Sequence, residues 1–128
     1  MLVFCRLKSP LKKLSNAKFK ISILEVPGAY EIPIAISKNI KKFDGFVALG
    51  CVIKGQTPHF DLICSSIFNT ILSLSIKYNK PIGNGVITAL NIRQAIQRSK
   101  KNKSKKTNKG SEAANAVISI LKNGPKKI

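Results

Sequence analysis

Apolar residues in this chain follow two different periods, and the shorter period predicts strands. Alternation or short apolar runs predict three strands, at residues 19–26, 45–52 and 81–88. In the first, Phe19, Ile21 and Ile23 share one face. The second run is apolar throughout, which is typical of a strand covered on both faces. In the third, Gly83 and Gly85 indicate that another backbone approaches closely.

The longer period predicts helices. Apolar residues at helical spacing predict four of them, at residues 31–42, 58–78, 92–98 and 111–121. Asn91 and Ser111 are the expected N-caps of the last two, because their short polar side chains accept from free N–H groups in the first turn. Residues 100–109 contain six lysines and almost nothing apolar, so a mobile, solvated loop is expected there.

Strands that alternate with helices predict an α/β fold. The expected architecture is a three-layer α/β/α sandwich, in which right-handed crossovers build a parallel sheet with helices on both faces. A length of 128 residues and 44% hydrophobic content suit one domain. Residues 19–122 are therefore assigned to a single domain. Residues 1–18 are expected to be an irregular remnant of an N-terminal strand and helix, and residues 123–128 a basic tail.

Composition argues against several classes of protein. Three cysteines, odd in number and without paired spacing, disfavour a disulfide framework and a zinc site. No apolar run is expected to approach the roughly 20 residues that span a membrane. The apolar residues 1–5 fall short of the roughly 7 to 15 residues of a signal-peptide core. We therefore expect a soluble, cytoplasmic protein without a membrane partner.

The net charge is strongly positive. Twenty-three Lys and Arg residues against five Asp and Glu residues give +18. Such a charge permits phosphate contacts with nucleic acid. However, the lysines are spread along the chain, aromatic residues are few, and no nucleic-acid-binding motif is present. The sequence therefore disfavours nucleic acid as a partner, although a basic nucleic-acid-binding protein stays open as an alternative.

The segment ALGCVIKGQTPHFD at residues 48–61 predicts a strand, a turn and a helix start. Thr57 is the expected N-cap, and Pro58 suits the first helical position. The first N–H groups of a helix lack internal partners and lie at the positive end of its dipole. These features predict an anion-binding site at Gly55, Gln56 and Thr57. Ordinary capping, without a ligand, is the alternative.

His59, the single histidine, falls in the first turn of this helix. The positive end of the dipole should favour a neutral imidazole there, which is suited to moving protons beside a bound anion. A capping or surface role is the alternative. A nucleophilic pair of Cys51 and His59 is less favoured, because Cys51 is expected at the end of a buried strand.

Ligands of parallel α/β sheets bind beyond the carboxyl ends of the strands. Three segments are expected to meet there, at residues 28–31, 54–59 and 88–91. Together they offer a carboxylate, an aromatic ring, an anion-binding turn and an imidazole. This combination favours a small phosphorylated substrate and proton-transfer chemistry.

Three motifs occur in order along the chain: VPGAYEIP at residues 26–33, GCVIKGQTPHFD at residues 50–61, and NKG at residues 108–110 followed by Glu112. Over about residues 19–121 they closely resemble the lumazine synthase family. The resemblance implies a flavodoxin-like fold. It also implies a transferase of riboflavin biosynthesis that joins 5-amino-6-(D-ribitylamino)uracil to 3,4-dihydroxy-2-butanone 4-phosphate. Phosphate and water are lost, and no metal or organic cofactor takes part.

The resemblance also implies roles for individual residues. His59 matches the proton-transfer residue of the family. Residues matching the site of the ribitylaminouracil are Ala29, Tyr30, Glu31, Cys51, Ile53, Asn84 and Lys109. Residues matching the site of the butanone phosphate are Gly55, Gln56, Thr57 and Arg98. A guanidinium fork suits a phosphate, and a carboxylate such as that of Glu31 suits the ribityl hydroxyls.

Family membership would imply assembly. Arg98 and Lys109 would reach the site from a neighbouring subunit of a homopentamer, which stays free or builds an icosahedral shell of up to sixty subunits. Riboflavin synthase would use the product downstream.

Three departures from the family pattern stand out. Only 18 residues precede Phe19, so residues 1–5 are expected either to form a short edge strand or to lie inside a first helix, without the aromatic that stacks on the pyrimidine. Asn84 stands where many relatives carry an aromatic. The lysine-rich loop is long and could misplace Arg98 and Lys109. An inactive, truncated relative that serves as an assembly or shell subunit therefore stays open as an alternative.

Overall fold

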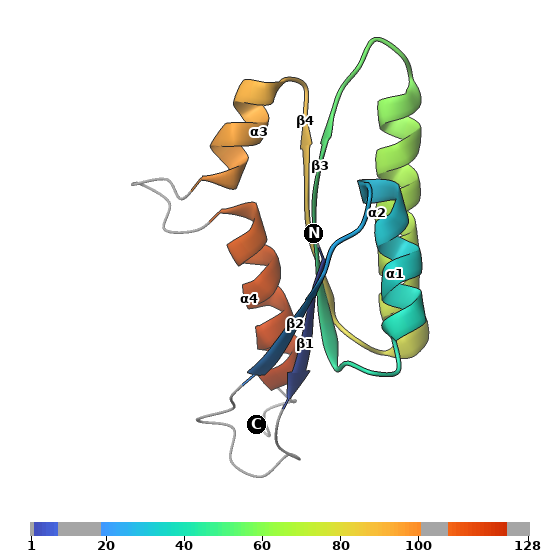
Figure 1. The fold of residues 1–128 in the computed structure, drawn as a ribbon, viewed down its shortest axis with the longest axis vertical. Coiled ribbons are helices and arrows are strands. Elements are labelled where there is room, and N and C mark those ends of the chain that lie inside the picture. Colours follow the sequence, from blue (N-terminus) through green and yellow to red (C-terminus); the bar gives the residue numbers. More distant parts are fainter. Residues whose placement is uncertain (1, 8–18, 101–107, 123–128) are drawn as a thin grey trace, which may run out of the picture.

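The computed structural model describes residues 2–7, 19–100 and 108–122 (Figure 1). The elements follow in the order β1 (Leu2–Leu7), β2 (Phe19–Leu24), the 3-10 helix η2 (Ala29–Glu31), α1 (Ile32–Asn39), β3 (Gly45–Ile53), α2 (His59–Tyr78), β4 (Ile82–Ala89), α3 (Ile92–Ser99) and α4 (Lys109–Lys122). The predicted helices and strands are thus confirmed, with boundaries that move by one to three residues. The predicted lysine-rich loop lies largely outside the described residues, as does the basic tail at 123–128.

The four strands form one sheet in the order β2-β1-β3-β4. β3 and β4 are parallel, and their register runs from Phe46 beside Ile82 to Ile53 beside Ala89. Helices α1 and α2 cover one face of the sheet, and α3 and α4 cover the other (Figure 1). The predicted three-layer α/β/α sandwich is confirmed.

Strand β1 differs from the expectation for the N-terminal segment. It lies inside the sheet rather than at an edge, and it is antiparallel to both β2 and β3. β2, β3 and β4 therefore share one direction. Only residues 8–18 connect β1 to β2, fewer than the dozen or more residues that a parallel crossover needs, whereas an antiparallel neighbour needs only a hairpin.

The apolar face predicted for β2 is largely uncovered. Ile21 and Ile23 are 60% and 62% exposed, because β2 is an outer strand of the sheet. At the start of the strand, the Lys122 ammonium lies 5.6 Å from the centre of the Phe19 ring. Helix α4 therefore reaches only one end of this face.

Two apolar clusters hold the layers together. The larger one joins α1 and α2 to the sheet and consists of Ile32, Ala35, Ile36, Ile40, Phe46, Ala48, Ile67, Ile71 and Val86. The smaller one joins α4 to the other face through Val47, Ala113 and Val117. Residues that alternate along β3 point into different clusters, as a strand covered on both faces requires.

Helix α2 meets the length and composition criteria for crossing a membrane. It has 20 residues and a window of mean hydropathy 1.3. The expectation that no apolar segment approaches this length is therefore wrong. Scattered Ser, Thr and Asn residues interrupt the apolar run, but the mean hydropathy of the helix still meets the criterion. Ile67 and Ile71 of α2 are buried in the larger cluster, but only 17% of this window is buried in all.

The helix starts confirm one predicted cap and correct two. Asn91 caps α3, because its Oδ1 accepts from the Gln94 backbone N–H at 3.0 Å. Ser111 does not cap α4: the helix starts two residues earlier, and Asn108 Oδ1 accepts from the Ser111 N–H at 2.8 Å. Thr57 does not cap α2, whose N-cap position is Pro58 and has no side-chain cap bond.

Asn108 also connects the two helices on either side of the lysine-rich segment. Its Nδ2 donates to the Ser99 carbonyl at 2.9 Å, so one side chain joins the end of α3 to the start of α4. The long insertion between the two helices therefore does not separate them. Arg98 and Lys109, which flank Ser99 and Asn108, are brought close to the same strand.

Helix α4 approaches the sheet closely where it crosses β4. A Cβ atom built on Gly83 would lie 2.3 Å from the Ala113 carbonyl oxygen and 2.9 Å from Val117 Cγ2. One built on Gly85 would lie 2.6 Å from Leu49 Cδ2 and 2.9 Å from the Ala48 carbonyl oxygen. The close backbone approach predicted from these two glycines is confirmed.

Gly83→Ala should destabilise the protein. Its methyl group would overlap a backbone carbonyl that no rotamer change can move, so we expect a loss of about 2 kcal/mol or more in the free energy of unfolding, measured by urea denaturation. Gly55→Ala is the control, because no atom lies within 4 Å of its Cβ position. Equal stability of the two variants would contradict the role assigned to Gly83.

Asn108→Ala should also destabilise, because it removes both the α4 cap and the bond to Ser99. We expect a loss of about 1 kcal/mol in the same measurement. Asn108→Asp keeps the capping oxygen and should retain most of the stability. An alanine variant as stable as the aspartate variant would show that the cap does not hold α4 in place.

Candidate functional site

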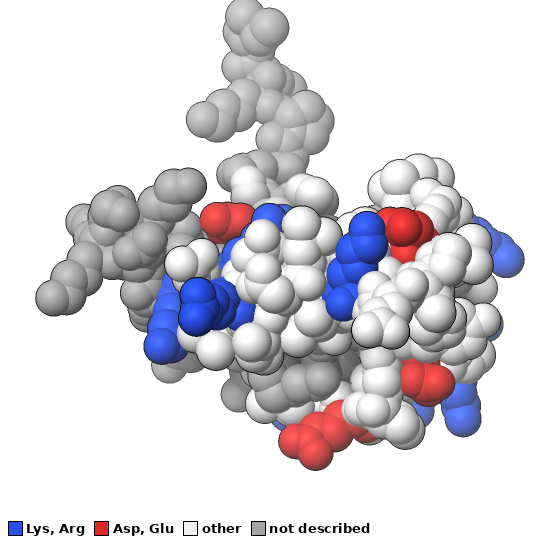
Figure 2. Space-filling model, turned by 90° about the horizontal axis from the view of Figure 1, so that it is seen from above, with Lys and Arg blue, Asp and Glu red and all other residues white. Residues whose placement is uncertain are grey.

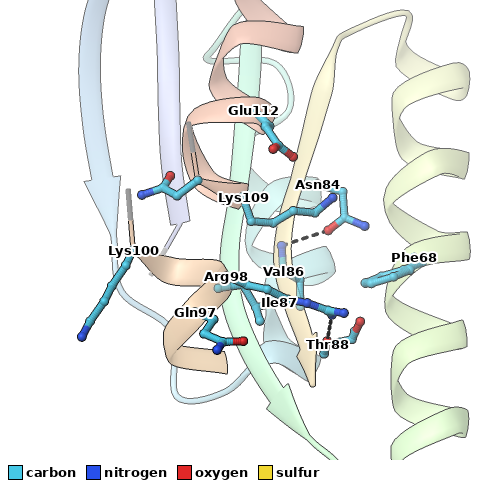
Figure 3. Close-up of a pocket in the computed structure, with 11 residues that line it drawn as sticks. Phe68, Asn84, Val86, Ile87, Thr88, Gln97, Arg98, Lys100, Lys109 and Glu112 are labelled. Carbon is cyan, nitrogen blue, oxygen red and sulfur yellow. Dashed lines mark hydrogen bonds between the residues drawn. The ribbon is translucent and has the colours of Figure 1, made fainter. Parts of the chain in front are cut away.

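Several of the predicted site residues surround a cavity at the outer edge of β4. This edge cavity has a volume of about 550 Å³, and its walls include Phe68, Asn84, Thr88, Arg98, Lys109 and Glu112 (Figure 3). Phe68 comes from α2 and the charged residues from α3 and α4, so the cavity wraps around the strand from one face of the sheet to the other. Asn84, Arg98 and Lys109 are thereby brought together from three elements.

Arg98 is held in the edge cavity by the strand itself. It lies in the last turn of α3, and its Nη1 donates to the Thr88 carbonyl oxygen. Among the described strands, β4 pairs with β3 alone, so this carbonyl belongs to the outer edge of the sheet. The guanidinium has five N–H donors, and those not used by Thr88 remain for a ligand. Arg98 is therefore positioned to bind an anion beside β4.

The charges around the edge cavity favour an anionic ligand. Arg98, Lys100 and Lys109 supply three positive charges, and Glu112 supplies one negative charge. Lys109 and Glu112 belong to the first turn of α4. Figure 3 shows that the Lys109 side chain extends toward Asn84, so a cation and an amide face the same space.

A second cavity lies between η2 and the first turns of α2. This helix cavity has a volume of about 460 Å³ and is lined by Tyr30, His59, Leu62, Ile63 and Ser66. It places an imidazole from the first residue of α2 beside a phenol from η2. The predicted meeting of residues 28–31 with residues 54–59 is therefore observed at Tyr30 and His59.

The groove next to the helix cavity brings in Glu31. It has a volume of about 500 Å³, lies between α1 and α2, and includes Tyr30 and Glu31 in its walls. Ala29 packs inward against the larger core cluster. The carboxylate of Glu31 turns back over Gly28, where an added Cβ would lie 3.0 Å from Glu31 Oε2.

The remaining predicted residues line neither cavity. Gly55, Gln56 and Thr57 are exposed in the turn between β3 and α2. Cys51 and Ile53 are exposed on the last part of β3, where their partners on β4 are Ile87 and Ala89. The turn is nevertheless tied to the third predicted segment, because the Lys54 N–H donates to the Ala89 carbonyl at 2.8 Å.

The cysteines differ from the sequence-based expectation. Cys51 is exposed. The expectation that it is buried, which disfavoured a nucleophilic pair of Cys51 and His59, is therefore wrong. Of the two cysteines whose side chains the structure describes, Cys64 of α2 is the buried one, and burial, together with the nearby Asp61 carboxylate, raises the pKa of its thiol. A raised pKa keeps the thiol protonated, which disfavours Cys64 as a nucleophile. Among the described residues, no group of three His, Cys, Asp or Glu side chains is placed to hold a metal ion.

Sequence reasoning missed two walls of the edge cavity. Phe68 was assigned to the apolar stripe of α2, but it is half-buried and lines the cavity. The carbonyl of Thr88 carries no sequence signal, because any residue supplies one. Only the position of β4 at the edge of the sheet makes this carbonyl available to Arg98.

The view from above, at the carboxyl ends of β3 and β4, does not show one continuous basic surface. Figure 2 shows Lys and Arg side chains separated by uncharged residues, with Asp and Glu side chains among them. A polyanion bound along this face would meet alternating charge. Among the described residues, the positive charge is therefore not gathered into one patch on this face.

Comparison with known proteins connects this geometry to a family. The family model of 6,7-dimethyl-8-ribityllumazine synthase matches residues 4–123. A protein of that name from Campylobacter curvus is 45% identical over 103 residues, covering 79% of this chain and 64% of the relative. Its namesake from Aliarcobacter butzleri is 39% identical over 116 residues, with 89% and 72% covered. Another from Bartonella tribocorum is 37% identical over 119 residues, with 91% and 79% covered.

The chain spans 64% of the length of the first of these relatives. The matched region nevertheless contains both cavities and all three motifs that carry the resemblance. A family model that matches nearly the whole chain agrees with the α/β/α sandwich and with the positions of the motifs around the sheet. The chain belongs to the 6,7-dimethyl-8-ribityllumazine synthase family.

Proposed function

We propose that the protein is a lumazine synthase, which joins 5-amino-6-(D-ribitylamino)uracil to 3,4-dihydroxy-2-butanone 4-phosphate and forms 6,7-dimethyl-8-ribityllumazine. The observation that carries the proposal is the edge cavity. Arg98 and Lys109 lie on opposite sides of a lysine-rich segment, yet both line one net positive space beside β4. A sugar phosphate carries the complementary charge.

The arrangement of the two cavities supports a site that is shared between copies of the chain. His59 and Tyr30 line the helix cavity, whereas Arg98 and Lys109 line the edge cavity. A substrate that contacts both sets needs the helix cavity of one copy to face the edge cavity of the next. We therefore propose a homo-oligomer, in which a ring of five copies would close this arrangement.

The chemistry of the reaction needs two kinds of help. An amine that condenses with a ketone expels water, so protons must move from nitrogen to oxygen. The His59 imidazole, exposed in the helix cavity, would carry out this transfer. The departing phosphate needs fixed positive charge, which the free donors of Arg98 and the exposed N–H groups of residues 55–57 would supply.

His59→Ala should slow lumazine formation about a hundredfold or more, because general acid–base groups contribute about that much. Lumazine is followed by its absorbance, and the spontaneous condensation rate is subtracted. The mass of the assembly is measured by light scattering and should not change. Parallel loss of activity and assembly would remove His59 from the chemistry.

Arg98→Ala should raise the KM for the butanone phosphate about tenfold or more, because a charge-assisted bond to phosphate is lost. The KM for the aminouracil should change much less. Arg93→Ala is the matched control, since Arg93 is an exposed arginine of the same helix α3. If both variants show the same KM for the phosphate, Arg98 does not bind it.

A further inference from the structure

A further cavity lies at the amino ends of β2 and β3. This basic cavity has a volume of about 440 Å³ and is lined by Lys20, Ser22, Lys41, Lys42 and Phe43. Lys20 and Ser22 are alternate residues of β2, so they share one face of that strand. Residues 41–43 belong to the connection between α1 and β3. Two segments that are distant in sequence therefore form its walls.

The basic cavity is separate from the residues assigned to lumazine chemistry. It shares no lining residue with the edge cavity, the helix cavity or the groove between α1 and α2. Residues 41–43 precede β3, whereas the turn at residues 54–57 follows it. β3 has nine residues, so its two ends lie roughly 25 Å apart. A small molecule bound at one end cannot reach the other.

The described walls of the basic cavity carry three positive charges and no negative charge. Lys20, Lys41 and Lys42 are exposed lysines, and Ser22 adds a hydroxyl group. Asp44, the next acidic residue along the chain, is half-buried and is not among the walls. Lysine ammonium groups act as compact point charges that bind phosphate oxygens. The composition of the walls therefore favours a phosphorylated anion.

The end of α1 beside this cavity would ordinarily repel an anion, because the last carbonyl groups lie at the negative end of the helix dipole. Lys80 counteracts that repulsion. Its Nζ donates to the Ile40 carbonyl and to the Phe43 carbonyl, each at 2.6 Å. A fourth ammonium group thus neutralises carbonyl groups on both sides of Lys41 and Lys42.

The backbone that carries these two lysines is also held in place. The two bonds from Lys80 restrain it, and the Lys42 N–H donates to the Asn39 carbonyl at 2.9 Å. The Phe43 ring packs edge-on against the ring of the buried Phe46, with 6.1 Å between their centres. A ligand therefore meets lysines on an ordered backbone, so binding costs less conformational entropy than it would on a mobile loop.

We propose that the basic cavity binds a small anion with two adjacent phosphate groups, either free diphosphate or the diphosphate of a nucleotide. A single phosphate group carries about −1.5 to −2 at neutral pH, and two joined groups come closer to balancing three lysines. The volume of the cavity lies within the roughly 300 to 1,000 Å³ of ordinary small-molecule sites. The inference does not rest on the proposed function.

The test measures the Kd of diphosphate and of ADP by isothermal titration calorimetry at about 0.15 M salt. It uses the full-length protein with Arg98→Ala, which removes an arginine of the edge cavity that could also bind these anions. In this background, the double variant Lys41→Gln/Lys42→Gln should raise both Kd values about tenfold or more, because two charged donors are lost. Lys20→Gln should raise them in the same direction.

The matched control is Lys38→Gln/Lys77→Gln, which removes the same charge from exposed lysines outside the cavity. Its Kd values should stay within about twofold of those of the background protein. A bound anion also joins β2 to the connection before β3, so diphosphate should raise the thermal unfolding midpoint of the control but not that of the double variant at the same concentration.

Three results would overturn the inference. The first is no measurable binding of either anion to the background protein. The second is equal weakening in the double variant and in the control, which would show attraction to the net charge alone. The third is tighter binding of an oligothymidylate of about ten nucleotides, weakened by the same substitutions, which would show a nucleic-acid surface. If the site is confirmed, tighter binding of ADP than of diphosphate identifies a nucleotide as the ligand, and equal binding identifies free diphosphate.

The proposed function is tested separately. In the protein that retains Arg98, Lys41→Gln/Lys42→Gln should form lumazine at the wild-type rate, because neither lysine lines the edge cavity or the helix cavity. A strong loss of lumazine formation in this folded variant would contradict the separation of the two sites.

Discussion

The contact between α4 and β4 is the constraint on which the rest of the structure depends. Gly83 lets the backbone of α4 lie directly on the strand, closer than any side chain would permit, and a Cβ atom on Gly85 would also crowd Ala113 of this helix. Ala113 and Val117, the residues of α4 in this contact, form the smaller core cluster with Val47. The missing side chain at Gly83 therefore permits the short distance between α4 and the sheet, and this distance sets where the first turn of α4 lies.

That first turn carries Lys109 and Glu112, so the contact also shapes the edge cavity. A helix held further from the sheet would carry the Lys109 amine away from Asn84. Asn108 adds a second restraint, because it caps α4 and donates to the last turn of α3 with the same side chain. This side chain therefore holds the end of α3 beside the start of α4 and keeps Arg98 and Lys109 close to the same strand.

Much of this architecture was predictable from the sequence, because periodicity and glycine placement are local signals. The three strands, four helices and the close approach at Gly83 and Gly85 were all expected. The direction of β1 was not, since the same apolar residues suit a strand of either direction. The caps at Thr57 and Ser111 were wrong for a related reason: several capping residues stand close together, and packing of the helix decides which one lies at its start. The position of His59 in a first helical turn indicated a site residue, and the resemblance to the family indicated Arg98, but the separate cavities that they line depend on the tertiary fold.

The unpaired edge of β4 explains why polar chemistry gathers there. An edge strand exposes N–H and C=O groups that need partners, and proteins cover them to avoid unwanted pairing with other strands. Here Asn84 covers the Val86 N–H, and Arg98 covers the Thr88 carbonyl. Each side chain is anchored by one of its polar groups and retains others that face the cavity. The need to satisfy the edge of the sheet therefore orients the same groups that face the edge cavity. A side chain anchored in this way would lose less conformational freedom if a ligand bound, so a structural bond at the strand edge also prepares the residue for binding.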